Sequence, residues 1–317
     1  MPEFDLIARI QARAASRGDV VLGIGDDAAI LRMPPGRDLV VAMDTLNSGV
    51  HFPEDTAPAD IGWKSLAVNL SDLAAMAATP AWCTLSLSLP QPDAAWVDGF
   101  LDGFLALATQ HEVALVGGDT TRGPLSVCVT VHGLVEPRGA LRRKGARVDD
   151  DVWVTGTLGD AAGALRQWQA GEAITPALRA RLDRPMPRVA AGRALAGIAS
   201  ACIDVSDGLL ADLGHVCRAS RIGAVLDVDA LPASEALRRA FDRRTVRTLQ
   251  SGGGDDYELC FTAPKTARLA IESASLACGA PATRIGRITA DAGEIALHDA
   301  QGVAWSPPRR GYEHFGG

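Results

Sequence analysis

Hydrophobic residues recur along this chain with two different periods, and each period predicts a different element. Residues 82–89 alternate strictly between apolar and hydroxyl side chains, which is typical of a half-buried strand. Apolar residues over 96–108 recur instead at helical spacing, and they predict a helix that packs on a core. The same reasoning predicts further strands at 20–24, 38–43, 113–116, 127–131, 152–155, 201–204, 257–262 and 284–289. It predicts helices at 4–10, 58–78, 159–169, 209–219 and 264–278, and one that ends at 200.

The order of these elements predicts two domains. A length of 317 residues suits about two of them, and the polar, basic and glycine-bearing segment 136–151 is the best candidate for the boundary. We therefore expect one domain over 1–137 and a second over 148–317. Because strands and helices mix throughout, the fold class is α/β (α+β), with mixed rather than purely parallel sheets.

Composition narrows the functional classes. The chain is 47% hydrophobic and 22% charged, with a formal net charge of −7, which argues against a nucleic-acid partner. We expect no membrane association, because no apolar run approaches the roughly 20 residues of a membrane span and the N-terminus carries acids, unlike a signal peptide. The 6 cysteines show no CxxC pairing, so reduced, buried thiols in the cytoplasm are expected.

Aspartate recurs in short segments flanked by glycine or serine, and most of them follow a predicted strand or open a helix. They are Gly25–Asp27, Met43–Thr45, Asn69–Asp72, Gly117–Gly123, Asp204–Gly208 and Gly252–Asp256. If folding brings them together, their carboxylates repel, by roughly 4 kcal/mol for two charges about 4 Å apart at an effective dielectric near 20. Mg²⁺ prefers such hard oxygen ligands and often lies between carboxylates and phosphates. The pattern therefore predicts a Mg²⁺-nucleotide enzyme.

Of these segments, 117–123 (GGDTTRG) is the strongest candidate for binding phosphate and metal. Its glycine pair after a strand lets backbone N–H groups approach phosphates, and its aspartate can hold a metal ion. The alternative is a tight hairpin turn. The segment is not a Walker A loop, because GxxxxGK[ST] occurs nowhere, and Gly23-Ile24-Gly25 lacks the third glycine of a dinucleotide fingerprint.

The other segments also have structural alternatives. Ser206 or Asp207 could simply cap the following helix, whereas Asp204 ends an apolar strand, where a carboxylate needs a partner. Asp72 could face solvent, although its apolar neighbours restrict the exposed arc. Arg143, within Arg142-Arg143-Lys144, could be part of a solvated basic patch rather than a phosphate ligand.

Taken together, these segments resemble the thiamine-monophosphate kinase family, of the PurM-like ATP-binding superfamily. The motifs that carry the resemblance are GIGDDAA (23–29), DTL with GVHF (44–52), AVNLSDLAAMAATPAW (67–82), GGDTTRGPL (117–125), VTGTLGDAAGAL (154–165), IDVSDGLLADLGH (203–215), GDDYELCF (254–261) and GYEHF (311–315). The resemblance implies a PurM-like two-domain fold. Its N-terminal mixed sheet would form a barrel shared within a homodimer, and its C-terminal domain would be an α/β layer sandwich.

The resemblance also implies the activity, which is transfer of the ATP γ-phosphoryl group to thiamine monophosphate, the last step of thiamine diphosphate biosynthesis. Several Mg²⁺ ions would be held by Asp27, Asp44, Asp72, Asp119, Asp204 and Asp207. Of these, Asp44, Asp72, Asp119 and Asp204 would be catalytic through charge neutralisation and alignment. ATP would contact Gly118, Asp119, Arg143 and Ser206, and thiamine monophosphate would contact His51, Asp255 and Tyr312.

Two positions depart from the family pattern. Asp255 stands where the family usually has Glu, so its contact with substrate is expected to be longer or bridged by water. Ala42 and Met43 stand where the family typically has hydroxyl residues, so neither is expected to bind metal through its side chain.

Two other functions remain open at this stage. One is another ATP-dependent enzyme of the superfamily, similar to aminoimidazole ribonucleotide synthetase or to a hydrogenase-maturation protein. The other is a non-catalytic nucleotide-sensing module. Residues 69–78, His51 and Gly311-Tyr312 favour the thiamine reaction.

Overall fold

A computed structural model describes residues 3–312, and the chain forms two compact units. The first covers the chain up to Leu73 together with Ala78–Arg138, and the second covers Ala74–Ala77 and the chain from Gly139 onward. Each unit has a sheet and a hydrophobic core of its own. None of the helices within residues 3–312 combines the length and the apolar run that crossing a bilayer requires.

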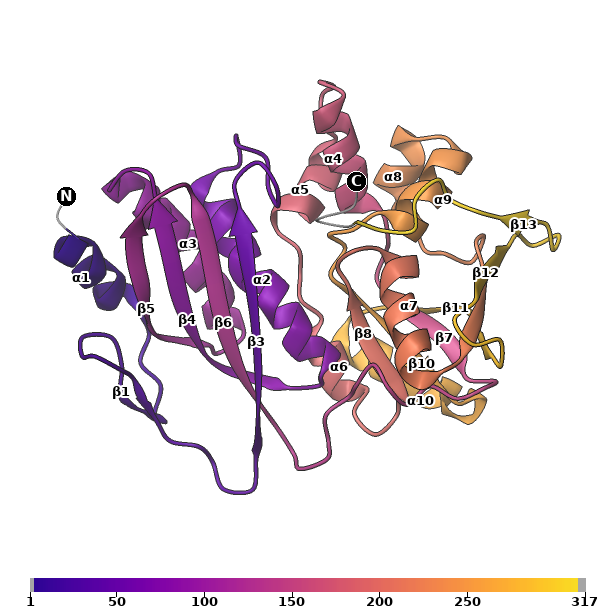
Figure 1. Cartoon of the computed structure of the whole chain (residues 1–317), viewed down its shortest axis with the longest axis horizontal. Helices are drawn as coiled ribbons and strands as arrows, with labels where there is room; N and C mark the ends of the chain where they lie inside the picture. Colours follow the sequence, from indigo (N-terminus) through magenta and orange to yellow (C-terminus); the bar gives the residue numbers. More distant parts are fainter. Residues whose placement is uncertain (1–2, 313–317) are drawn as a thin grey trace. The chain divides into compact units, whose positions relative to one another are not determined.

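The first unit is built on a four-stranded sheet with the strand order β3-β6-β4-β5 (Figure 1). β6 is antiparallel to both β3 and β4, whereas β4 and β5 are parallel, which confirms the predicted mixed sheet. A small two-stranded ribbon, β1-β2, precedes it. The elements in chain order are α1 (Glu3–Arg13), β1 (Val20–Leu22), β2 (Ile30–Leu31), β3 (Asp38–Asn47), α2 (Pro58–Ala75), β4 (Thr79–Leu89), α3 (Ala94–Gln110), β5 (Ala114–Arg122) and β6 (Ser126–Val135).

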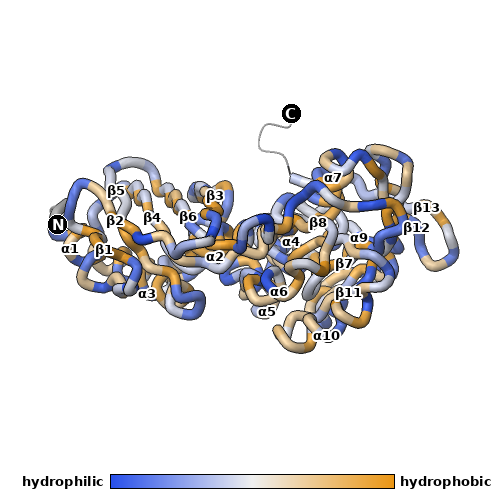
Figure 2. The backbone as a smooth tube through the Cα atoms, turned by 90° about the horizontal axis from the view of Figure 1, so that it is seen from below, coloured by the Kyte–Doolittle hydropathy of each residue, from blue (hydrophilic) through white to orange (hydrophobic). Residues whose placement is uncertain are grey.

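Helices α2 and α3 cover one face of this sheet (Figure 2). They pack closely because two glycines lie where they cross. A Cβ on Gly62 would lie 2.0 Å from the carbonyl oxygen of Phe100, and one on Gly103 would lie 1.7 Å from that of Ala59. This packing fixes the rotation of α2 over the sheet, and α2 carries the predicted metal ligand Asp72.

The other face of β3 remains exposed. Along this strand, half-buried and buried positions alternate with exposed ones. Leu39, Val41 and Met43 are 46%, 54% and 61% exposed, respectively. Among the described residues, β3 is also an edge strand, since β6 is its one neighbour in the sheet. The first unit therefore presents an apolar stripe beside an unpaired strand edge.

The second unit is built on a seven-stranded sheet with the order β13-β12-β9-β11-β7-β10-β8 (Figure 1). Neighbouring strands are antiparallel except β9 and β12. Its elements are β7 (Asp151–Thr155), α4 (Asp160–Gln169), α5 (Pro176–Asp183), α6 (Val189–Ala194), β8 (Ala201–Val205), α7 (Leu209–Ser220), β9 (Gly223–Asp227), α8 (Glu235–Ala240), α9 (Arg243–Gly252), β10 (Glu258–Ala263), the 3₁₀ turn η1 (Lys265–Ala267), α10 (Arg268–Cys278), β11 (Ala282–Thr289), β12 (Ile295–His298) and β13 (Ala304–Trp305).

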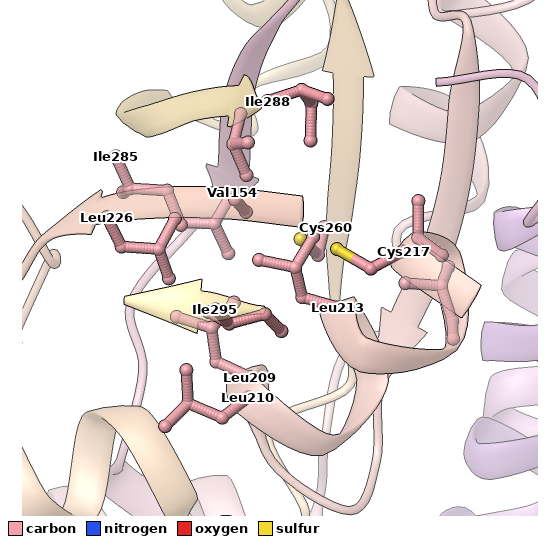
Figure 3. Packing of buried hydrophobic residues seen from close by; sticks show 14 of the residues in the cluster. Val154, Leu209, Leu210, Leu213, Cys217, Leu226, Cys260, Ile285, Ile288 and Ile295 are labelled. Carbon is pink, nitrogen blue, oxygen red and sulfur yellow. The ribbon is translucent and has the colours of Figure 1, made fainter. Parts of the chain in front are cut away.

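Helix α7 packs its apolar face on this sheet (Figure 3). Leu209, Leu213 and Cys217 follow one another at four-residue spacing, so they lie on one side of the helix. They contribute to a core cluster that also contains Val154 of β7 and Cys260 of β10. Strands β7, β10 and β8, which are neighbours at one end of the strand order, are buried along their whole length, and α7 begins immediately after the loop that follows β8.

Some elements differ from the sequence prediction. The strand expected at 113–116 continues to Arg122, because the glycine-rich segment pairs with β4 along its length. The helix expected from Pro264 begins with a 3₁₀ turn, so α10 starts at Arg268. The sequence reasoning did not identify α5, α8, α9, β2, β9, β12 and β13, which lack a clear hydrophobic period or are very short.

Candidate functional site

In the second unit, two loops that are distant in sequence are hydrogen-bonded to each other. One follows β8 and contains Ser206 and Asp207, and the other precedes β10 and contains Asp255. The Asp255 N–H donates to the Ser206 carbonyl at 2.8 Å, and the Tyr257 N–H donates to the Val205 carbonyl at 2.8 Å. The structure thus brings together the predicted ATP ligand Ser206, the predicted metal ligand Asp207 and the predicted substrate residue Asp255.

The C-terminal segment adds Tyr312 to these loops. Its backbone N–H donates to the Asp207 carbonyl at 2.9 Å, and its side chain is half exposed. Close approaches hold this segment in place, since a Cβ on Gly252 would lie 2.5 Å from the carbonyl oxygen of Arg309. The last residues of the GYEHF motif, 313–315, lie outside the described residues.

The loop that carries Asp255 has an unusual backbone. Asp255 and Tyr257 have φ of 67° and 50°, a left-handed conformation that costs non-glycine residues on the order of 1–3 kcal/mol each. The Tyr257 hydroxyl donates to Oδ1 of Asp255 at 2.9 Å. Such strain is retained where the surrounding structure enforces it, and it is concentrated at ligand sites. The Asp255 carboxylate is therefore positioned before any ligand arrives.

A buried ion cluster lies beneath this loop. Glu258 is fully buried and accepts hydrogen bonds from Arg188 at 2.6 and 2.5 Å, from Arg181 at 2.8 Å and from the Thr155 hydroxyl at 2.7 Å. Both carboxylate oxygens of the neighbouring Asp256 accept the Gly159 N–H. Burial raises the pKa of Asp256 well above its usual range, partly offset by that hydrogen bond. These contacts fix the start of β10, and with it the end of the strained loop.

Asp212, on the first turn of α7, organises the loop after β8. Its buried Oδ2 accepts the backbone N–H groups of Ser206, Asp207 and Gly208 at 3.0, 3.1 and 3.1 Å. Burial, together with the negative charges of Asp204 and Asp207, raises the pKa of Asp212 to about 8. This region therefore concentrates negative charge, and a bound divalent cation would relieve the repulsion. The donor set is made of carboxylate oxygens, which suits Mg²⁺.

Arg143 lies in a segment that is tied to the C-terminal end of α7. Oγ of Ser220 accepts the N–H groups of Gly145 and Ala146 at 3.1 and 3.3 Å, and it donates to the Arg143 carbonyl at 3.4 Å. The pKa of His215 on α7 is lowered by burial and then by the positive charges of Arg218 and Arg143, while Asp207 opposes that shift. Arg143 and Asp207 thus both act on the same imidazole of α7.

In the first unit, Asp44 and Asp72 lie at the interface of β3 with α2. The Asp44 N–H donates to Oδ1 of Asn69 at 2.9 Å, and Asn69 is fully buried. Asp72 follows Asn69 by three residues, so it lies one helical turn further along the same face of α2. Both aspartates are half-buried. The structure therefore brings these two predicted metal ligands to one side of the first unit.

Gly118 and Asp119 belong to strand β5 rather than to a tight hairpin turn. Gly118 has φ of 153°, and a Cβ there would lie 1.8 Å from the Leu85 carbonyl oxygen, so this position requires glycine. Gly118 and Asp44 lie in one row across the sheet, because Gly118 pairs with Leu85, Leu85 pairs with Val129, and Val129 pairs with Asp44. Three spacings of about 4.8 Å separate the two strands by about 14 Å in a flat sheet. Asp44 and Asp119 therefore lie on strands that are about 14 Å apart.

His51 lies in the loop between β3 and α2. Its Nδ1 accepts the Asn47 N–H at 3.0 Å, which leaves Nε2 to carry the proton of the neutral ring. Nζ of Lys64 donates to the His51 carbonyl at 3.0 Å, and this lysine is 1% exposed. A buried ammonium group on α2 thus holds the loop that carries a predicted substrate residue.

Asp27 is exposed in the loop between β1 and β2, and its N–H donates to Oδ1 of Asp26 at 2.8 Å. Within residues 3–312, no three carboxylate, imidazole or thiol side chains are grouped closely enough to form a ready-made metal site.

The sequence reasoning missed three residues that organise these loops. They are Asp212, Tyr257 and Lys64. The two that could have been noticed are Lys64, a charged residue inside a long apolar stretch, and Asp212, inside the quoted motif IDVSDGLLADLGH. Nothing in the local sequence signals that the Tyr257 hydroxyl reaches Asp255.

Comparison with known proteins places the chain in a family. Residues 25–135 match the AIR synthase related protein N-terminal domain, and residues 147–299 match the corresponding C-terminal domain. A thiamine-monophosphate kinase of Salmonella typhimurium is 47% identical, over 99% of this chain and 98% of its own.

Solved structures of thiamine-monophosphate kinases have the same fold as this chain. A thiamine-monophosphate kinase from Stenotrophomonas maltophilia superimposes with a TM-score of 0.88 at 54% identity, over 96% of this chain and 98% of its own. AaThiL complexed with AMPPCP and TMP has a TM-score of 0.77 at 28% identity, over 99% of this chain and 97% of its own. The hydrogenase maturation protein HypE shares the fold at 19% identity, with a TM-score of 0.72.

Proposed function

The chain belongs to the thiamine-monophosphate kinase family, and on that basis we propose that it transfers the γ-phosphoryl group of ATP to thiamine monophosphate, yielding thiamine diphosphate and ADP. The observation that carries this proposal is the 47% identity over nearly the whole chain, which includes every loop of the candidate site. The AaThiL complex with AMPPCP and TMP supports it further, since AMPPCP is an ATP analogue.

We assign roles in the second unit to the residues that its loops bring together. Asp204 and Asp207 hold Mg²⁺, while Ser206 and Arg143 contact ATP. Support comes from the negative charge around Asp212 and from the opposite influences of Arg143 and Asp207 on the pKa of His215. Asp255 and Tyr312 contact thiamine monophosphate, in keeping with the strained, positioned carboxylate of Asp255.

In the first unit, we assign Mg²⁺ binding to Asp27, Asp44, Asp72 and Asp119. Gly118 and Asp119 contact ATP, and His51 contacts thiamine monophosphate. Gly118 and Asp119 are both exposed and Gly118 has no side chain, which supports the ATP assignment because a phosphate can approach bare backbone closely. Since the carboxylates within residues 3–312 do not form a ready-made cluster, phosphate and water oxygens would complete the coordination, as is common for Mg²⁺.

The chemistry requires little covalent participation from the protein. The acceptor is a phosphate oxygen that is already deprotonated near neutral pH, so no strong general base is needed. The residues of the site bind the two phosphate groups and align them for in-line transfer. Bound Mg²⁺ supplies the charge neutralisation that lets two anionic groups approach. This division of labour explains why carboxylates, rather than a nucleophilic cysteine or histidine, dominate the motifs.

We also propose that the protein is a cytoplasmic homodimer that serves thiamine biosynthesis. The apolar stripe Leu39, Val41 and Met43 on the open face of an edge strand supports pairing with a second copy, because a soluble monomer rarely leaves such an edge uncovered. The cysteines are all free thiols, which suits a reducing compartment.

The decisive experiment is an assay with ATP, Mg²⁺ and thiamine monophosphate, in which chromatography measures ADP and thiamine diphosphate. Equal amounts of both products are expected. Asp72→Asn should lower turnover at least tenfold, about 1.4 kcal/mol of barrier, with an unchanged melting temperature. ADP that forms only with another acceptor would point to a different enzyme of the superfamily. ATP binding without ADP formation would point to a sensing module.

A further inference from the structure

Helices α8 and α9 concentrate positive charge on a chain whose net charge is −7. Five arginines lie within residues 238–247, namely Arg238, Arg239, Arg243, Arg244 and Arg247. Glu235 pairs with Arg239, and Asp229 pairs with Arg243 and Arg247. Within residues 3–312, the guanidinium groups of Arg238 and Arg244 form no ion pair, so this surface has a local excess of positive charge.

These arginines line two hollows in the second unit. The first, of about 330 Å³, is bordered by Arg238, Arg243 and Arg247 and by the apolar side chains of Val228, Leu231, Phe241 and Val246. The second, of about 430 Å³, is bordered by Arg243, Arg244 and Arg247 and by Thr248, Trp305 and Ser306. Because Arg243 and Arg247 border both, the two hollows adjoin each other, and we name them together the α8–α9 groove.

Asp229 orients two of the guanidinium groups at the centre of this groove. Its Oδ1 accepts hydrogen bonds from Arg243, at 2.8 Å, and from Arg247, while its Oδ2 accepts the Ala300 N–H at 3.2 Å. Burial would raise the pKa of Asp229, but the hydrogen bonds from Arg247 and Arg243 lower it to about 2, so the carboxylate stays ionised. Each guanidinium has five N–H donors, and Nε of Arg247 is buried without a partner among the described residues.

A purely structural role explains only part of this arrangement. The contacts of Asp229 with Arg243, Arg247 and Ala300 join the loop after β9 to α9 and to the segment after β12. They give no role to Arg238 or Arg244, which border the groove without a carboxylate partner. Guanidinium groups recognise phosphate through paired N–H donors, and pockets of this size with apolar walls hold small organic molecules.

We propose that the α8–α9 groove is a second ligand site, which binds a small organic molecule through a phosphate group. The phosphate is held by Arg238, Arg243 and Arg244, and an apolar or aromatic body packs against Phe241 and its apolar neighbours. This site is separate from the loops assigned to phosphoryl transfer, although α9 leads from the groove directly into the loop that carries Asp255.

The test measures binding of phenyl phosphate and of inorganic phosphate to the full chain by isothermal titration calorimetry in EDTA. EDTA removes the divalent cations that would hold phosphate at the carboxylate-rich loops, and the variants described next assign the measured binding to the groove. Saturable binding of phenyl phosphate is expected, at least threefold tighter than that of inorganic phosphate because the ring is buried. Equal affinities would contradict the organic body, and the absence of saturable binding would overturn the site.

Two double variants test the residues. Arg238→Ser with Arg244→Ser removes the unpaired guanidinium groups and should weaken phenyl phosphate binding at least tenfold. Arg239→Ser with Arg287→Ser removes the same charge from exposed positions outside the groove, and should change the affinity less than twofold. Equal weakening in both would show that only overall charge matters, and would refute the proposal. Thermal melting confirms folding, and since no kinase assay is used, the outcome is independent of the proposed phosphoryl transfer.

Discussion

Asp255 shows how one short loop can prepare a carboxylate for its ligand. Two constraints fix the backbone of this loop. Asp255 and Tyr257 both have a left-handed backbone conformation, and their N–H groups donate to the carbonyls of Ser206 and Val205 at the end of β8. The Tyr257 hydroxyl then holds Oδ1 of Asp255. Because the family resemblance implies a longer Glu at this position, we expect the tyrosine contact to help set where the shorter Asp side chain points.

Tyr257→Phe tests that role. The substitution removes one hydrogen bond to a charged group, typically worth about 1.5–3 kcal/mol, but the backbone constraints remain. We expect KM for thiamine monophosphate to rise roughly three- to tenfold, while kcat and KM for ATP change little. Steady-state kinetics with each substrate varied in turn measures this split. An unchanged KM for thiamine monophosphate would show that the hydroxyl does not position Asp255.

Asp212 acts through the backbone of its neighbours. Asp212→Leu removes the acceptor of three N–H groups, of which that of Gly208 belongs to a buried residue, and a buried unsatisfied donor costs on the order of 1–3 kcal/mol. We expect a lower melting temperature and an increase of at least tenfold in the Mg²⁺ concentration needed for half-maximal turnover. Asp212→Asn keeps one carbonyl acceptor and should restore most of the Mg²⁺ response. If Leu and Asn variants need the same Mg²⁺ concentration as the wild type, Asp212 does not position the loop.

At the scale of elements, the C-terminal end of α7 is coupled to the segment that carries Arg143. Ser220→Ala removes the three hydrogen bonds that join them. Because the guanidinium of Arg143 would then be held less firmly, we expect KM for ATP to rise about threefold to tenfold, equivalent to roughly one hydrogen bond. Ser273→Ala, at an exposed position of α10, is the control and should leave KM unchanged. If both variants change KM for ATP equally, Ser220 does not position Arg143.

Elements with a clear hydrophobic period were predictable from the sequence. The strand expected at 82–89 and the helix expected at 96–108 lie within β4 and α3, since their buried positions recur at the strand and helix periods. The extension of β5 to Arg122 was not predictable, because its glycines and polar residues pair through backbone groups that leave no hydrophobic signal. Helix α9 was missed for a related reason, as arginines and hydroxyl residues surround its few buried positions.

In the candidate site, some residues could be predicted from the sequence, but most of the contacts between them could not. A carboxylate at the end of an apolar strand identified Asp204 from the sequence, and the structure buries it at 5% exposure. Arg143 became a candidate through the family resemblance rather than through its local pattern. The contacts of Asp212 with three N–H groups, and of Lys64 with the His51 carbonyl, depend on which backbone atoms folding brings near, which no local pattern encodes.

At the scale of the whole molecule, charge is distributed unevenly. The chain is acidic overall, with 38 acidic against 31 basic side chains, so bulk charge does not attract anionic substrates. Binding of phosphates must then depend on local cations. Arg143 is the cation assigned to phosphate binding in the transfer site, and the α8–α9 groove concentrates others elsewhere in the second unit.

The last prediction concerns assembly through the open face of β3. If a second copy covers the apolar stripe, light scattering after size-exclusion chromatography should give twice the chain mass of 33.1 kDa. Met43→Asp places a charge on the most exposed residue of this stripe, where burial would strip the carboxylate of water. We expect the dimer dissociation constant of this variant to be at least tenfold higher than that of the wild type.

Met186→Asp, at a methionine of the second unit that is 39% exposed, should leave the mass unchanged. A monomeric wild type, or a Met43→Asp variant that dimerises as tightly, would mean that β3 does not form the interface.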